Sequence, residues 1–124
     1  MVTRQEGEAL VDELAGKADP ARAAKIDAQF AGKLARIEAD GLLPPEVVAR
    51  LKVMWTMFHE PDQRVPWTQK ALIMAALGYL VAPLDLIPDL AGKAGYFDDK
   101  MVINIVYRRL GAAVTGFGGV VIAD

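Results

Sequence analysis

The chain has 124 residues, the size of one domain, and 53% of them are hydrophobic. Its 14 basic and 16 acidic residues give a net charge of −2, which argues against general nucleic-acid binding because that function needs a basic surface. The absence of cysteine excludes disulfides and cysteine-ligated metals, and a single histidine argues against a His-rich metal site. Composition therefore indicates a small folded domain and does not name an activity.

Three amphipathic helices are predicted in residues 1–65. The first, over about 3–15, begins at Thr3, where a glutamate three residues later completes a capping box. The second begins at Asp19, which precedes a proline, and ends at Gly41. The third begins at the two prolines 44–45 and ends before residue 59. In the second helix, one apolar face is formed by Ile26, Phe30, Leu34 and Ile37.

The fourth predicted helix begins near Trp67 and continues into a stretch, residues 71–84, that has no charged side chain. This stretch is apolar around its whole circumference, so it predicts a buried helix with no face toward solvent. It is shorter than the roughly 20 residues that a bilayer crossing needs. Trp67, at its start, is a candidate anchor at a membrane interface, whereas Trp55 is expected in the core.

A last helix is expected from residue 97 or 98 to Leu110, with acidic residues at its start and arginines at its end. The tail that follows, residues 111–124, is rich in glycine and has no charge before Asp124. Its small residues Gly111, Thr115 and Gly119 are four apart, as in a small-xxx-small helix contact face. We therefore expect this tail to pack against another surface.

The densest motif in the chain lies between these last two helices. Its residues are Tyr79, Pro83, Asp85, Pro88, Asp89, Gly95, Tyr96, Asp98 and Asp99. The pattern Tyr-Leu-x-x-Pro-x-Asp-Leu-Ile-Pro-Asp, a five-residue spacer and then Gly-Tyr-x-Asp-Asp resembles a bacterial family of unknown function typified by YkvA, over about residues 70–99. The spacer of this chain lacks the proline and bulky aliphatic residues that the family pattern leads us to expect. The resemblance implies a helical domain often linked with membranes, and it implies no reaction, substrate or cofactor.

Two interpretations of the four aspartates remain open. Aspartate is favoured at helix N-caps and turns, so Asp85, Asp89, Asp98 and Asp99 are explained by hydrogen bonds to backbone N–H groups. Alternatively they converge at one end of the helix pair and bind Mg²⁺ or Ca²⁺, which prefer oxygen ligands. The lone His59 is expected to be a helix C-terminal cap and not a ligand.

The sequence thus predicts an all-α fold, a small bundle of about five helices with a C-terminal hydrophobic helical hairpin. We divide it into an amphipathic N-terminal part (1–65), a YkvA-like helical hairpin (66–110) and a Gly-rich apolar tail (111–124) within one compact unit.

For function, we expect a non-enzymatic helical module that needs no cofactor. The charge-poor residues 71–84 and 110–123 are expected to exceed what three amphipathic helices can cover, so they would meet another copy, a protein partner or lipid. No signal peptide is apparent, so we expect the chain on the cytoplasmic side, at the inner membrane if it is membrane-associated, and not among secreted proteins. One alternative is a soluble cytoplasmic homo-oligomeric adaptor, and a less favoured one is a metal-dependent enzyme using the aspartate loop.

Overall fold

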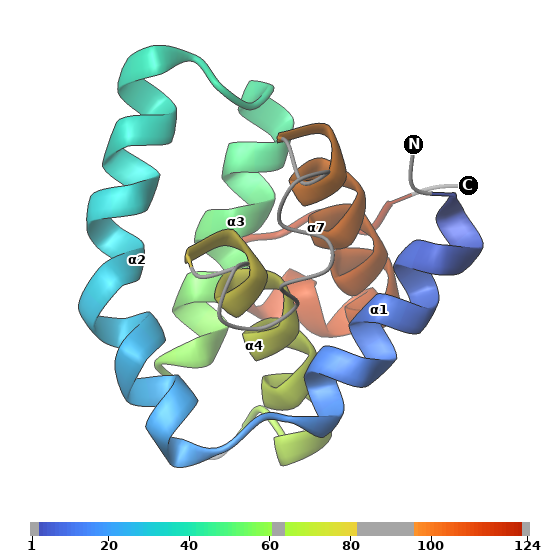
Figure 1. The fold of residues 1–124 in the computed structure, drawn as a ribbon. Coiled ribbons are helices and arrows are strands. Elements are labelled where there is room, and N and C mark those ends of the chain that lie inside the picture. Colours follow the sequence, from blue (N-terminus) through green and yellow to red (C-terminus); the bar gives the residue numbers. More distant parts are fainter. Residues whose placement is uncertain (1–2, 61–63, 82–95, 123–124) are drawn as a thin grey trace.

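The computed structural model describes residues 3–60, 64–81 and 96–122. In these ranges the chain forms five α-helices and a terminal 3₁₀ helix, with no strand, which confirms the all-α fold. The elements are α1 (Arg4–Gly16), α2 (Pro20–Asp40), α3 (Pro45–Phe58), α4 (Trp67–Val81), α7 (Tyr96–Leu110) and η1 (Gly111–Phe117) (Figure 1).

The helix starts and stops follow the local signals in the sequence. The Thr3 hydroxyl accepts a hydrogen bond from the Glu6 N–H at 3.1 Å and donates one to the Glu6 carboxylate at 3.0 Å. The Asp19 carboxylate accepts one from the Arg22 N–H at 2.8 Å, and Gly41 ends α2 in the left-handed region at φ 63°. These caps satisfy backbone groups that have no partner within the helix, so the predicted boundaries are confirmed.

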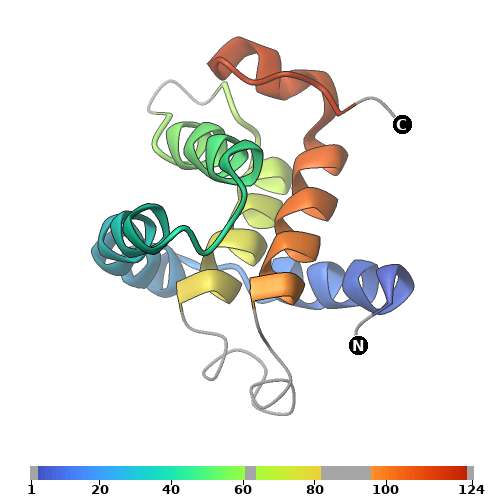
Figure 2. The ribbon, with the colours of Figure 1, turned by 90° about the horizontal axis from the view of Figure 1, so that it is seen from above.

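Helix α4 lies at the centre of the bundle, in contact with α1, α2, α3 and α7 (Figure 2). Ala71 and every residue from Ile73 to Leu80 are buried, as expected for a helix that is apolar on all sides. The expectation that the chain could not cover this stretch itself is corrected for residues 71–81. Four helices of the same chain surround it, because α1 and α7 cover the side that α2 and α3 leave open.

Helices α4 and α7 pack against each other, and α4 ends where α7 begins, at the same end of the molecule (Figure 2). Helix α7 starts at Tyr96, one residue earlier than the first of the two predicted starts, and ends at Leu110 as predicted. Residues 82–95, which join the two helices, lie outside the described residues. The complete hairpin therefore stays a prediction.

The tail does not form the expected small-xxx-small contact face. Gly111 has a left-handed φ of 59°, which ends α7, and the chain continues as the 3₁₀ helix η1. A 3₁₀ helix has three residues per turn, so residues four apart do not share a face. Thr115 is exposed, and its hydroxyl donates to the Ala112 carbonyl at 2.7 Å, while Val114 is the buried contact.

The central position of α4 makes the stability of the protein depend on its apolar side chains. Leu77 has no exposed surface, whereas Leu72 on the same helix is half-buried. We expect Leu77→Ala to lower the free energy of unfolding by about 3 kcal/mol, through lost burial and a cavity. Leu72→Ala is the matched control, with a loss of about 1 kcal/mol, because solvent already reaches its side chain. Urea unfolding measures both, and equal losses would contradict the central placement of α4.

Candidate functional site

The motif residues fall on two described helices and on the segment between them. Tyr79 lies near the end of α4 with 1% of its surface exposed, and Tyr96 is the first residue of α7. Asp98 and Asp99 lie in the first turn of α7 by their backbone positions. The remaining motif residues, Pro83, Asp85, Pro88, Asp89 and Gly95, lie outside the described residues. Neither capping by the four aspartates nor their convergence is therefore tested.

The described ranges contain no group of three or more His, Asp or Glu side chains arranged to hold a metal ion. This absence does not extend to the four motif aspartates, whose side chains lie outside the described part of the chain. Across the same ranges, none of the helices combines the length and apolar character that a bilayer crossing needs.

Beside Tyr107 of α7, a groove lies between α3 and the tail, and we call it the tail groove. Its volume is about 400 Å³. Its lining residues are Glu46, Ala49, Arg50, Val53, Tyr107 and Gly118 to Ile122. Polar and apolar groups therefore meet in one concave surface, which is the usual composition of a binding site.

Tyr107 fixes the tail along this groove. Its hydroxyl donates to the Val120 carbonyl at 2.9 Å and accepts from the Val120 N–H at 3.0 Å. Gly118 has a φ of 84°, and a Cβ at Gly119 would lie 2.5 Å from the Tyr107 hydroxyl oxygen, so both positions require glycine. Gly118 and Gly119 are therefore the residues that let the tail approach Tyr107.

Arg50 lies in the same groove, half-buried. Its Nη1 donates to the amide oxygen of Asn104 at 2.7 Å, and its guanidinium carbon lies 5.7 Å from the centre of the Tyr107 ring. Asn104 and Tyr107 are three residues apart on α7, so they share one helix face. The guanidinium therefore joins α3 to α7 through an uncharged amide and an aromatic ring.

Arg109, on another side of α7, has a different environment. Its Nη1 donates to Asp12 at 2.6 Å and its Nε to Glu8 at 2.8 Å, which joins α7 to α1. The hydrogen bond to Asp12 is the largest cause that raises the pKa of Arg109 above its ordinary value, Glu8 adds to it, and burial opposes both. Because these three side chains are partly exposed, we expect their ion pairs to contribute only modestly to the packing of α7 against α1.

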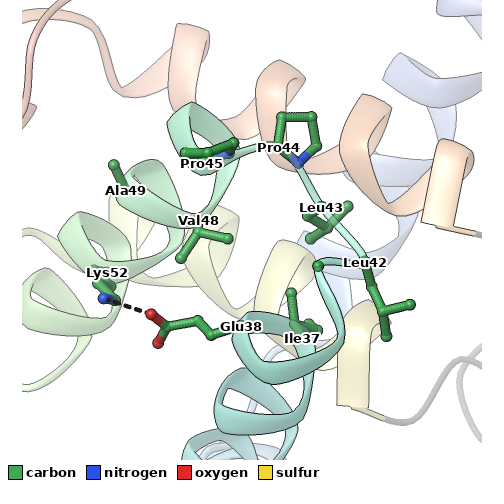
Figure 3. A pocket seen from close by; sticks show the side chains of 10 residues that line it. Ile37, Glu38, Leu42, Leu43, Pro44, Pro45, Val48, Ala49 and Lys52 are labelled. Atoms are coloured by element: carbon green, nitrogen blue, oxygen red, sulfur yellow. Dashed lines mark hydrogen bonds and ion pairs between the residues drawn. The ribbon is translucent and has the colours of Figure 1, made fainter.

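A second, larger hollow of about 680 Å³ lies where α2 ends and α3 begins (Figure 3). Its wall is mostly apolar, with Ile37, Leu42, Leu43 and Val48 around the turn. The Lys52 amine lies 3.1 Å from the Glu38 carboxylate across one side of it, so the charges there are already paired (Figure 3).

His59 is the C-terminal cap residue of α3, as predicted. Its Nδ1 donates to the Trp55 carbonyl at 2.9 Å, and its Nε2 lies 2.5 Å from an Asp27 carboxylate oxygen on α2. Trp55 is half-buried and stacks on Phe30 with ring centres 4.5 Å apart, so it belongs to the core edge as expected. Trp67 is 56% exposed, which leaves it available as a surface anchor.

Sequence reasoning missed Arg50, Asn104 and Tyr107 as a group. The spacing of Asn104 and Tyr107 on one helix was a visible signal, but their partners Arg50 and Val120 belong to other elements. Arg50 and Asn104 are 54 positions apart, and nothing local in the sequence predicts that they meet.

Comparison with known proteins gives one family. The model of a protein family of unknown function, DUF1232, matches residues 69–105, which cover most of α4 and the first two thirds of α7. No curated protein and no solved structure matches the chain. Over these residues the chain is similar to an uncharacterised family, in agreement with the kind of family that the motif suggested.

The Tyr107 hydroxyl is expected to hold the tail in place. We expect Tyr107→Phe to raise the hydrogen-exchange rate of the Val120 amide by about tenfold or more, because its acceptor is lost. Amides in the middle of α7 serve as the internal control and keep their rates. If the Val120 amide exchanged at an unchanged rate, the tail would be held by its apolar contacts and not by this hydroxyl.

Proposed function

We propose that this chain is a non-enzymatic helical module that assembles with further copies of itself through its C-terminal tail. The observation that carries the proposal is the exposure of Val120 and Val121, 80% and 45%, on a segment whose backbone is fixed by Tyr107. An apolar tip that is held in place loses little conformational freedom when it binds, so it is suited to docking. The narrower assignment to the YkvA-like family belongs to this proposal and is supported by the motif around the matched segment.

Burial favours the tail over α4 as the contact. In α4, Ala71 and residues 73–80 are buried under the chain's own helices, whereas the tail presents valines to solvent. A second copy would cover these valines, which belong to the charge-poor stretch 110–123 that we expect to need a partner.

Self-association through the tail is tested by Val120→Asp. A carboxylate in an apolar contact costs about 2 kcal/mol or more, which weakens association by roughly thirtyfold. We expect wild-type protein to show a mass above 13.4 kDa by light scattering and Val120→Asp to return to that monomer mass. Ala28→Asp on the exposed side of α2 is the control and keeps the wild-type mass. A wild-type monomer at high concentration would contradict the proposal.

Association with a membrane surface is the second candidate, and the exposed indole of Trp67 favours it. Tryptophan partitions to the boundary between headgroups and acyl chains, so a helix that starts with it has an anchor. We expect the protein to float with liposomes of mixed neutral and anionic lipid, and Trp67→Ala to reduce the bound fraction by about threefold or more. Trp55→Phe is the control because Trp55 is half-buried and stacks on Phe30. An unchanged bound fraction for Trp67→Ala would exclude Trp67 as the anchor.

A further inference from the structure

We propose that the tail groove binds the carboxylate end of a fatty acid, with Arg50 holding the carboxylate and the tail covering the apolar chain. This site goes beyond self-association and does not depend on it. The proposal starts from the charge of Arg50 and then follows the walls of the groove.

Arg50 is a half-buried cation whose described partners are both uncharged, the Asn104 amide oxygen and the Tyr107 ring. The contrast with Arg109 is informative, because that side chain meets the carboxylates of Glu8 and Asp12. A guanidinium removed from water without a carboxylate partner is incompletely compensated. Its planar fork of N–H donors also matches the geometry of a carboxylate. An anion that binds beside Arg50 in the groove therefore gains more binding free energy than it would beside an arginine at the exposed surface.

The walls beyond Arg50 are apolar. Ala49 and Val53 come from α3, and Val121 and Ile122 come from the tail. The hollow of about 400 Å³ lies in the size range of small-ligand sites. A ligand with one charged end and a hydrocarbon chain matches both parts of this lining.

The backbone of the tail favours a fatty acid over a peptide. A peptide that pairs with an extended segment needs free N–H and C=O groups along it. At Val120 both groups are already bonded to the Tyr107 hydroxyl. A hydrocarbon chain needs no such groups, so the groove satisfies it without rearranging the tail.

Glu46 also lines the groove, one turn before Arg50 on α3. Its carboxylate is exposed and repels an incoming anion. Removing this negative charge should therefore change the affinity for a fatty acid in the direction opposite to removing the charge of Arg50. Arg50→Gln is expected to weaken fatty-acid binding, and Glu46→Gln is expected to strengthen it.

The experiment is calorimetric titration of the full chain with octanoate and, separately, with 1-octanol, which has the same hydrocarbon chain and no charge. We expect octanoate to bind about tenfold or more tightly than octanol. Arg50→Gln should weaken octanoate binding by at least the same factor and leave octanol binding unchanged. Arg36→Gln, an exposed arginine next to Asp40 on α2, is the matched control and should leave both unchanged.

Ala49→Leu keeps the test decisive if Arg50→Gln does not fold. Ala49 is exposed on α3, so leucine there is compatible with the helix and narrows the groove while Arg50 stays in place. We expect Ala49→Leu to weaken the binding of both octanoate and octanol. In the wild-type protein, octanoate binding should change the chemical shifts of the Gly118, Gly119 and Val121 amides. Equal affinity for octanoate and octanol, no binding of octanoate, or tighter binding of an apolar tetrapeptide than of octanoate would each overturn the proposal.

Discussion

A helix that is apolar on every side is stable in water only if other segments cover it completely, and this requirement organises the whole chain. Helix α4 has no polar face, so its neighbours must surround it. The amphipathic helices α1, α2 and α3 each contribute one apolar stripe, and α7 contributes another. The family match covers α4 and part of α7 but none of the first three helices. Those helices nevertheless complete the core, because without them the sides of α4 that face α1, α2 and α3 would be open to water.

Polar contacts on α7 then join the elements around this core. Arg109 joins α7 to α1 through its hydrogen bond to Asp12. Asn104 accepts a hydrogen bond from Arg50 of α3, and Tyr107 is hydrogen-bonded to the tail. Three residues of α7 thus connect this helix to three different parts of the chain. Each contact alone is worth little at a partly exposed site, but together they fix the direction in which the tail leaves the bundle.

The direction of the tail is what gives the molecule a distinctive surface. The tail returns along α3 and encloses a groove, and the two exposed valines Val120 and Val121 belong to the lining of that groove. Self-association and the fatty-acid site both follow from this arrangement, but they rest on different properties of it. The first depends on the exposed apolar area of Val120 and Val121 on the tail, and the second depends on Arg50, a cation in the groove that lacks a carboxylate partner among the described residues.

From the sequence alone we could predict the five α-helices of the described residues, most of their ends and the burial of α4. These features depend on local chemistry: Thr3 and Asp19 cap helices with their own side chains, Gly41 adopts a positive φ, and an uncharged run of residues must avoid water. The tertiary structure decided which residues meet. The pairing of Arg50 with Asn104 depends on how α3 lies against α7, and the two hydrogen bonds of Tyr107 depend on the path of the tail. No spacing within one element encodes either of them. For the same reason the spacing of Gly111, Thr115 and Gly119 predicts a helix contact face, whereas in the fold Gly118 and Gly119 lie where the tail turns onto Tyr107.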